Sequence, residues 1–132
     1  MPITTLLIAG LHGLLLLALL WPVVKLRRGR KIGIGDGGDR ELLRRVRVHA
    51  NFVEYVPMLL VLLALLELSG VDRRAVAALG VVMLVARMLH AQGLGGSEGY
   101  SFGRFWGTLL TWGVLLAGSL LAITVALMRL MP

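Results

Sequence analysis

The stretch ITTLLIAGLHGLLLLALLWPVV, residues 3–24, decides the class of fold because it contains no Asp, Glu, Lys or Arg. A helix that crosses the hydrocarbon core of a bilayer needs about 20 predominantly apolar residues. A cleaved signal peptide is the alternative, but such a leader has basic residues before its apolar run and a small-residue cleavage site after it. Here the basic residues follow the run and the sequence shows no such site, so we expect a permanent transmembrane helix.

The rest of the chain has the same apolar character. Of its 132 residues, 58% are hydrophobic and 16% are charged, and the mean hydropathy is +0.85, which is too apolar for an ordinary small soluble domain. Three further windows, at about residues 49–69, 75–94 and 104–128, are long enough to cross a bilayer. Gly70-Val71-Asp72 and a glycine-rich stretch from Gly93 to Gly103 separate them. We therefore predict one domain, residues 1–132, that is an all-α integral membrane protein built as a four-transmembrane-helix bundle.

The sequence contains no cysteine, which limits the chemistry of the protein itself. Disulfides, a thiolate nucleophile and a zinc–thiolate site are excluded, so any sulfur chemistry needs a thiol brought by a ligand. His49 has no second histidine or carboxylate at the spacing of zinc ligands. We predict no metal site.

Basic residues gather at one end of the predicted bundle. Eleven lie between the first two spans or bound the loop between the third and fourth, namely Lys25, Arg27, Arg28, Arg30, Lys31, Arg40, Arg44, Arg45, Arg47, Arg87 and Arg104. Only Arg73, Arg74 and Arg129 belong to the other end. Because Lys and Arg mark the cytoplasmic side of membrane helices, we expect both termini on the non-cytoplasmic side. The net charge of +7 favours anionic lipid headgroups or an acidic ligand as partner, and no nucleic-acid-binding motif is present.

The second span begins with polar residues that the membrane must accommodate. Asp39 is a candidate N-cap, and the helix could run from there to about Leu68, roughly 45 Å. Its uninterrupted apolar part, residues 55–66, covers only about 18 Å, so Asn51 and Glu54 must lie at membrane depth. Together with Arg44 and Arg47 they follow steps of three and four, which puts all four side chains in one stripe of the helix. Lipid cannot solvate this stripe, so we expect it to face protein or a wet cavity.

The other three spans bring more polar residues to the same layer. Arg87 and His90 lie three residues apart near the end of the third span, Arg104 begins the fourth, and Arg27 with Lys25 ends the first. We predict that these residues and the stripe form a charged pocket at the cytoplasmic end of the bundle.

Structural roles are the alternative interpretation of these residues. The flanking residues Lys25, Arg28, Arg30, Lys31 and Arg45 are typical of side chains that reach headgroups, and Arg27 and Arg44 could do the same. Glu54 could neutralise Arg47 or Arg87 as an ion pair, and Asn51 could join two helices. His12 and Glu67 are interpreted as structural, with Glu67 reaching the opposite membrane interface.

The pattern Arg44-x-x-Arg47-x-His49-x-Asn51-x-x-Glu54-Tyr55-x-Pro57 resembles the second-helix signature of the MAPEG superfamily, the membrane-associated proteins in eicosanoid and glutathione metabolism. Arg87-Met88-Leu89-His90 and Arg104 are similar to family motifs in the third and fourth helices. The chain most resembles small bacterial members, which implies a multi-pass protein of the bacterial inner membrane.

The resemblance implies a homotrimer with cytosol-facing sites between neighbouring subunits, each binding glutathione as a co-substrate. The residues that it assigns to glutathione binding are Arg27, Arg44, Arg47, Asn51, Glu54, Tyr55, Arg87 and His90, with Lys25 as an alternative to Arg27. It assigns activation of the thiol to Arg104. Glutathione has two carboxylates and one ammonium, so arginines and a carboxylate such as Glu54 suit it chemically. An arginine near the sulfur favours the reactive thiolate.

Three positions depart from the pattern of some relatives, because Ala50, Leu94 and Thr108 stand where those have an arginine or a tyrosine.

Three functions therefore stay open. The leading one is a glutathione transferase or peroxidase-like enzyme that acts on lipophilic electrophiles. The second is a non-catalytic module that binds an anionic lipid or metabolite in the same pocket. The third is a small transporter, which the position of the polar residues at one end rather than at the midplane disfavours.

Overall fold

The computed structural model describes residues 1–96 and 99–131, and the regular secondary structure of this part of the chain is all α-helix. The four helices are α1 (Ile3–Arg30), α2 (Arg40–Leu68), α3 (Arg73–Gly96) and α4 (Phe102–Leu130). Each is long and apolar enough to cross a membrane. The predicted all-α fold with four membrane-spanning helices is confirmed. The helices extend beyond the apolar windows because their charged ends continue the same helical backbone.

Local chemistry explains where these helices begin and end. The Asp39 carboxylate accepts a hydrogen bond from the Leu42 N–H at 2.8 Å, so the predicted N-cap of α2 is confirmed. Ser101 caps α4 in the same way through the Arg104 N–H. Gly70, with a φ of +78°, follows α2 and takes a left-handed conformation that favours glycine.

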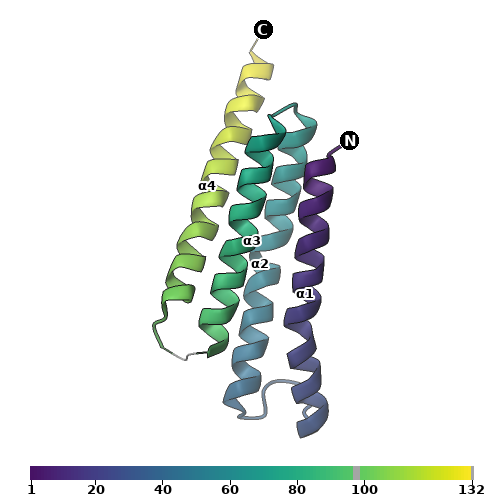
Figure 1. Ribbon diagram of the computed structural model, residues 1–132, viewed down its shortest axis with the longest axis vertical. Coiled ribbons are helices and arrows are strands. Elements are labelled where there is room, and N and C mark those ends of the chain that lie inside the picture. Colours follow the sequence, from purple (N-terminus) through teal and green to yellow (C-terminus); the bar gives the residue numbers. More distant parts are fainter. Residues whose placement is uncertain (97–98, 132) are drawn as a thin grey trace.

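The helices alternate in direction, so both termini lie at one end of the bundle (Figure 1). The end of α1 and the start of α2 lie at the other end, which we call the basic end because Arg27, Arg30 and Arg40 are there. Arg30 holds this end together through ion pairs with Asp39 and Glu41. The outer helices α1 and α4 lie on opposite sides of the bundle, with α2 and α3 between them.

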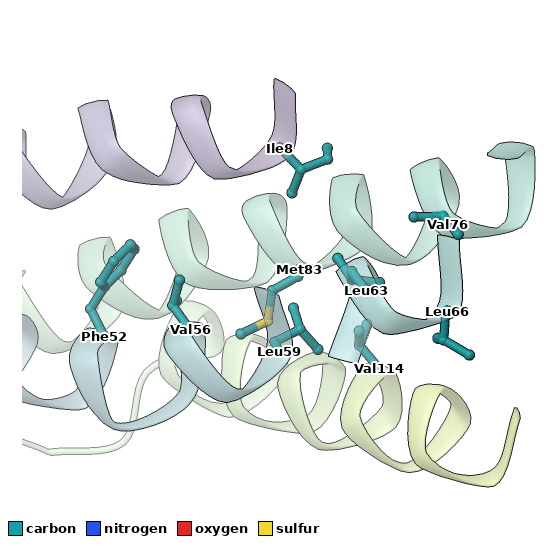
Figure 2. Close-up of a cluster of buried hydrophobic side chains, with 9 residues drawn as sticks. All are labelled: Ile8, Phe52, Val56, Leu59, Leu63, Leu66, Val76, Met83 and Val114. Atoms are coloured by element: carbon teal, nitrogen blue, oxygen red, sulfur yellow. The ribbon is translucent and has the colours of Figure 1, made fainter. Parts of the chain in front are cut away.

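The apolar core is built around α2. Five buried side chains follow this helix in steps of four and three: Phe52, Val56, Leu59, Leu63 and Leu66. The other helices contribute Ile8, Val76, Met83 and Val114 (Figure 2). Most of the apolar surface of α1 and α4 stays outside this core, as expected for helices that face lipid or another subunit.

Glu67 fastens the start of α1 to the end of α2. Its carboxylate accepts hydrogen bonds from the backbone N–H groups of Thr4 and Thr5, at 2.9 and 2.8 Å, and from the Thr5 hydroxyl at 2.8 Å. These N–H groups belong to the first turn of α1 and have no partner within their own helix. Glu67 thus has a structural role at the end of the bundle opposite the basic end.

Candidate functional site

A cavity of about 400 Å³ opens at the basic end between α2, α3 and α4. Its wall combines four arginines with an asparagine, a histidine and two leucines. In chain order these are Arg40, Leu43, Arg44, Arg47, Asn51, His90, Leu94 and Arg104. We call it the cationic cavity. It brings together five of the nine residues that the sequence assigns to a site: Arg44, Arg47, Asn51, His90 and Arg104.

Arg87 lies behind this cavity and joins three helices. Its side chain is only 2% exposed. Its Nη2 donates a hydrogen bond to the Asn51 Oδ1 at 2.6 Å, and its Nη1 donates to the Thr111 Oγ1 at 3.3 Å. The guanidinium also lies 5.8 Å from the centre of the Tyr55 ring, within the range of a cation–π contact. Arg87 therefore orients Asn51, which lines the cavity.

The buried Arg87 Nε and His90 Nδ1 have no hydrogen-bond partner within residues 1–96 and 99–131. His90 is 5% exposed and lines the cavity. Buried polar groups without partners are costly in a fold and are common where a ligand or water binds. The pair thus marks this layer as suited to a polar ligand.

Thr111 and Gly107 belong to the site, although the sequence did not mark them as site residues. Thr111 is 1% exposed and its hydroxyl donates to the Gly107 carbonyl at 2.7 Å, which leaves its oxygen free to accept from Arg87. A Cβ on Gly107 would lie 2.6 Å from both the Cβ and the backbone N of His90. Close contact between α3 and α4 thus needs this glycine. The sequence offers small residues at this point of α4 but nothing that identifies their partners.

The polar stripe of α2 divides into two parts. Asn51 and Arg44 are half-buried, whereas Arg47 and Glu54 are exposed on the surface of this single subunit. Neither Arg47 nor Glu54 forms an ion pair or hydrogen bond with the residues that the structure describes. The possible ion pairs of Glu54 with Arg47 or Arg87 are therefore absent from this part of the chain. Glu54 lies two turns from the cavity residue Arg47, on the exposed surface of the subunit.

Arg27 and Tyr55 lie outside the cationic cavity. Arg27 donates a hydrogen bond to the Gly33 carbonyl at 3.3 Å and so supports the loop that follows α1. The Tyr55 hydroxyl accepts a hydrogen bond from the Trp112 Nε1 at 3.5 Å. Tyr55 thus connects the Arg87 layer to the outer side of α4.

An aromatic groove of about 470 Å³ runs along this outer side of α4. Its lining residues come from one face of the helix and the segment before it: Gly99, Tyr100, Ser101, Arg104, Phe105, Thr108, Leu109 and Trp112. Arg104 lines both the groove and the cationic cavity. Arg104 is therefore a shared wall of a polar compartment suited to an anion and an apolar compartment rich in aromatic rings.

Comparison with known proteins agrees with this architecture. A family model described as the MAPEG family matches residues 5–124. Two relatives, both called Inner membrane protein YecN, come from Escherichia coli strain K12 and from E. coli O6:H1 strain CFT073. Each is 39% identical over 85 residues, which is 64% of this chain and 65% of the relative. The aligned segment therefore covers just under two thirds of either relative, whereas the family match covers nearly the whole bundle. This four-helix membrane chain belongs to the MAPEG family.

Proposed function

We propose that the protein binds glutathione in the cationic cavity and conjugates it through its sulfur to lipophilic electrophiles, or reduces them, as a membrane glutathione transferase or peroxidase-like enzyme. The observation that carries this proposal is the position of Arg104, which lines both the cationic cavity and the aromatic groove. A two-substrate reaction between a polar thiol and an apolar electrophile needs two such compartments that meet at the reacting atoms.

The cationic cavity suits a small acidic tripeptide in charge and in size. Arginine forks bind carboxylates through two parallel hydrogen bonds, and Arg40, Arg44 and Arg47 line one side of the cavity. Its volume of about 400 Å³ lies within the usual range for small-molecule sites. Asn51, held by Arg87, adds a neutral amide that can bind the peptide groups of the ligand.

Arg104 has the catalytic role in this proposal. A guanidinium beside the ligand sulfur favours the thiolate over the thiol. The thiolate then attacks the electrophilic carbon, a carbon–sulfur bond forms, and the electron pair leaves with the departing group or moves to an activating carbonyl oxygen that water then protonates. The electrophile reaches the groove from the bilayer, in which apolar compounds concentrate.

The single subunit leaves part of this site incomplete, which favours a homotrimer with sites between neighbouring subunits. Glu54 and Arg47 are exposed on this subunit, and Glu54 belongs to the part of α2 that has to cross the membrane, where lipid cannot solvate a charge. In a trimer, Glu54 of one subunit would face the cavity of the next and bind the ammonium of glutathione. The two Escherichia coli relatives are named as inner membrane proteins, which supports a location in the bacterial inner membrane.

A non-catalytic binding module is the second candidate, and two residues favour it. Thr108 lines the groove, but its hydroxyl donates to the Arg104 carbonyl at 2.9 Å and so cannot also donate to a sulfur. Leu94 lines the cavity and has no hydrogen-bonding group. The site then has few partners for the thiolate besides Arg104, which suits binding of an anionic lipid or metabolite without a reaction.

Calorimetry of glutathione with the detergent-purified protein tests the proposal. We expect binding at millimolar glutathione or below, and a loss of roughly tenfold in affinity for Arg47→Ala and Glu54→Gln. Arg28→Ala is the matched control, because Arg28 is an exposed basic residue at the same end that does not line the cavity. Absence of binding at millimolar glutathione would contradict the proposal.

Turnover with an activated aryl chloride separates the two candidate functions. For an enzyme we expect Arg104→Ala to lower kcat by roughly 100-fold while glutathione affinity changes by only a few-fold, since its charge acts on the reacting sulfur. Binding of glutathione without any turnover by the unaltered protein would instead favour the non-catalytic module.

A further inference from the structure

We propose that the aromatic groove selects flat aromatic electrophiles over aliphatic ones of the same size and reactivity, and that Trp112 and Phe105 determine this preference. The inference rests on the proposed function and names the substrate class of the same site. It starts from the composition of the groove, in which Tyr100, Phe105 and Trp112 line the space next to Arg104.

Because the groove competes with the surrounding lipid for apolar compounds, its aromatic side chains determine which compounds it binds. An apolar compound dissolved in lipid gains little by moving into an aliphatic groove, because lipid tails are as apolar as leucine side chains. Affinity inside a membrane must therefore come from specific contacts such as ring stacking, edge-to-face packing and hydrogen bonds. Aromatic side chains form stacked or edge-to-face contacts with an aromatic ligand, but a saturated ligand cannot form such ring contacts.

The rings of the groove contact one another and the neighbouring helix. The Trp112 Nε1 donates to the Tyr55 hydroxyl at 3.5 Å, which connects the indole to α2 although Trp112 is 57% exposed. The Tyr100 and Phe105 rings pack with their centres 6.1 Å apart. Phe105 also meets Trp106 edge to face at 5.6 Å. Rings that already pack against one another lose less conformational freedom on binding than isolated rings, so the ring contacts contribute to affinity.

The spacing along α4 places an aromatic ligand within reach of the sulfur. Arg104 and Trp112 lie on the same face of the helix, eight residues or about 12 Å apart along its axis. Phe105 and Thr108 fill the interval. A compound with one or two rings would extend from Trp112 toward Arg104 and present a reactive carbon conjugated to its ring at the wall shared with the cationic cavity.

The matched pair of substrates is 4-phenyl-3-buten-2-one and 4-cyclohexyl-3-buten-2-one, which carry the same enone. In both, the glutathione thiolate adds to the β-carbon, the carbon–sulfur bond forms, the π electrons move to the carbonyl oxygen, and water supplies the proton. Rates are divided by the uncatalysed rates with glutathione alone, which removes differences in intrinsic reactivity. We expect a KM about five- to tenfold lower for the phenyl compound, with similar normalised kcat.

Substitutions in the groove test whether its aromatic rings cause the preference for the phenyl compound. We expect Trp112→Leu and Phe105→Leu to raise the KM for the phenyl compound about fivefold and to leave the KM for the cyclohexyl compound within twofold. Trp21→Leu is the matched control, since Trp21 is an exposed tryptophan on α1 that does not line the groove. Equal use of both enones by the unaltered protein, or an equal loss for both in Trp112→Leu, would overturn the inference.

Binding of the unreactive ketones 4-phenyl-2-butanone and 4-cyclohexyl-2-butanone tests the aromatic selectivity of the groove without any catalysis. The protein in nanodiscs, without glutathione, should bind the phenyl ketone at least fivefold more tightly, and Trp112→Leu should abolish the difference. If turnover with glutathione is absent and this preference is present, the proposed reaction fails and the aromatic selectivity stands. If glutathione is bound and turned over without any such preference, the selectivity alone is wrong.

Discussion

Arg87 shows how one residue organises this site. Its guanidinium leaves α3 and donates to Asn51 on α2 and Thr111 on α4. A buried charge that keeps its partners is tolerated, whereas removal of one partner leaves the charge without compensation. The contribution of the Arg87–Asn51 hydrogen bond to the free energy of unfolding can therefore be separated from the free-energy cost of burying the arginine.

A double-mutant cycle at these two positions tests this coupling. We expect Asn51→Leu to lower the free energy of unfolding by about 2 kcal/mol, because the hydrogen bond to a charged group is lost. The double variant Asn51→Leu/Arg87→Met should lose less than the sum of the single variants, by about 1 kcal/mol or more, since the unpaired charge is then gone. Unfolding in mixed detergent micelles gives these values, and strict additivity would contradict the coupling.

The sequence predicted some members of this layer and missed another for a physical reason. Arg87 and Asn51 are conspicuous because charged and amide groups are expensive in apolar helices. Thr111 is not conspicuous, since a threonine in a transmembrane helix can bond to its own backbone, as its hydroxyl does with Gly107. Only the packing of α3 against α4 in the structure shows that Arg87 contacts Thr111.

At the level of helices, glycines set the distance between α3 and α4. The Gly103 Cα lies so close to α3 that a Cβ there would be 2.5 Å from the Leu89 carbonyl oxygen. At Gly107 a Cβ would lie 2.7 Å from the Ala86 carbonyl oxygen. Both clashes involve backbone, which cannot move without separating the helices. These glycines therefore place Arg104 beside His90.

Alanine substitution on α4 should distinguish this packing role from helix propensity. We expect Gly107→Ala to destabilise the protein by about 2 kcal/mol through overpacking and to weaken glutathione binding. Gly113→Ala, where a Cβ meets nothing within 4 Å, should be neutral or stabilise the helix by about 0.5 kcal/mol. Thermal unfolding of the two variants in one detergent makes the comparison, and equal melting temperatures would argue against close packing at Gly107.

The contact between α1 and α2 depends on a carboxylate that caps a neighbouring helix. Glu67 accepts from Thr4 and Thr5, more than 60 residues away along the chain. A negative charge at a helix N-terminus is favourable and satisfies N–H groups that have no other partner. Sequence patterns identify caps only within a few residues, which is why the partners of Glu67 could not be predicted.

Substitution of Glu67 should loosen the start of α1. We expect Glu67→Leu to cost about 2 kcal/mol of unfolding free energy, and Thr5→Val, which removes only the hydroxyl, to cost about 1 kcal/mol. Hydrogen exchange of the first turn of α1 reports the change directly. Unchanged protection of the Thr4 and Thr5 amides in Glu67→Leu would show that the carboxylate does not hold this end.

At the scale of the whole molecule, the sequence predicts the number and class of the helices but not what covers their outer faces. Apolar length and charged flanks are properties of each segment, so the four spans could be predicted one by one. The stripe of α2 follows from helical periodicity, yet periodicity does not say what lies opposite it. The structure places Arg47 and Glu54 on the exposed surface of the single subunit.

The direction of the bundle across the membrane can be tested because the chain contains no cysteine. Eleven basic residues on the side of the basic end, against three on the other side, predict that the basic end faces the cytoplasm. Ile34, 95% exposed in the loop between α1 and α2, and Met131, 64% exposed after α4, lie on opposite sides. In spheroplasts, a membrane-impermeant maleimide should label Met131→Cys at once and Ile34→Cys only after permeabilisation. The cysteine-free parent gives the background, and the reverse labelling pattern would place the cationic cavity outside the cell, where no cytosolic thiol could reach it.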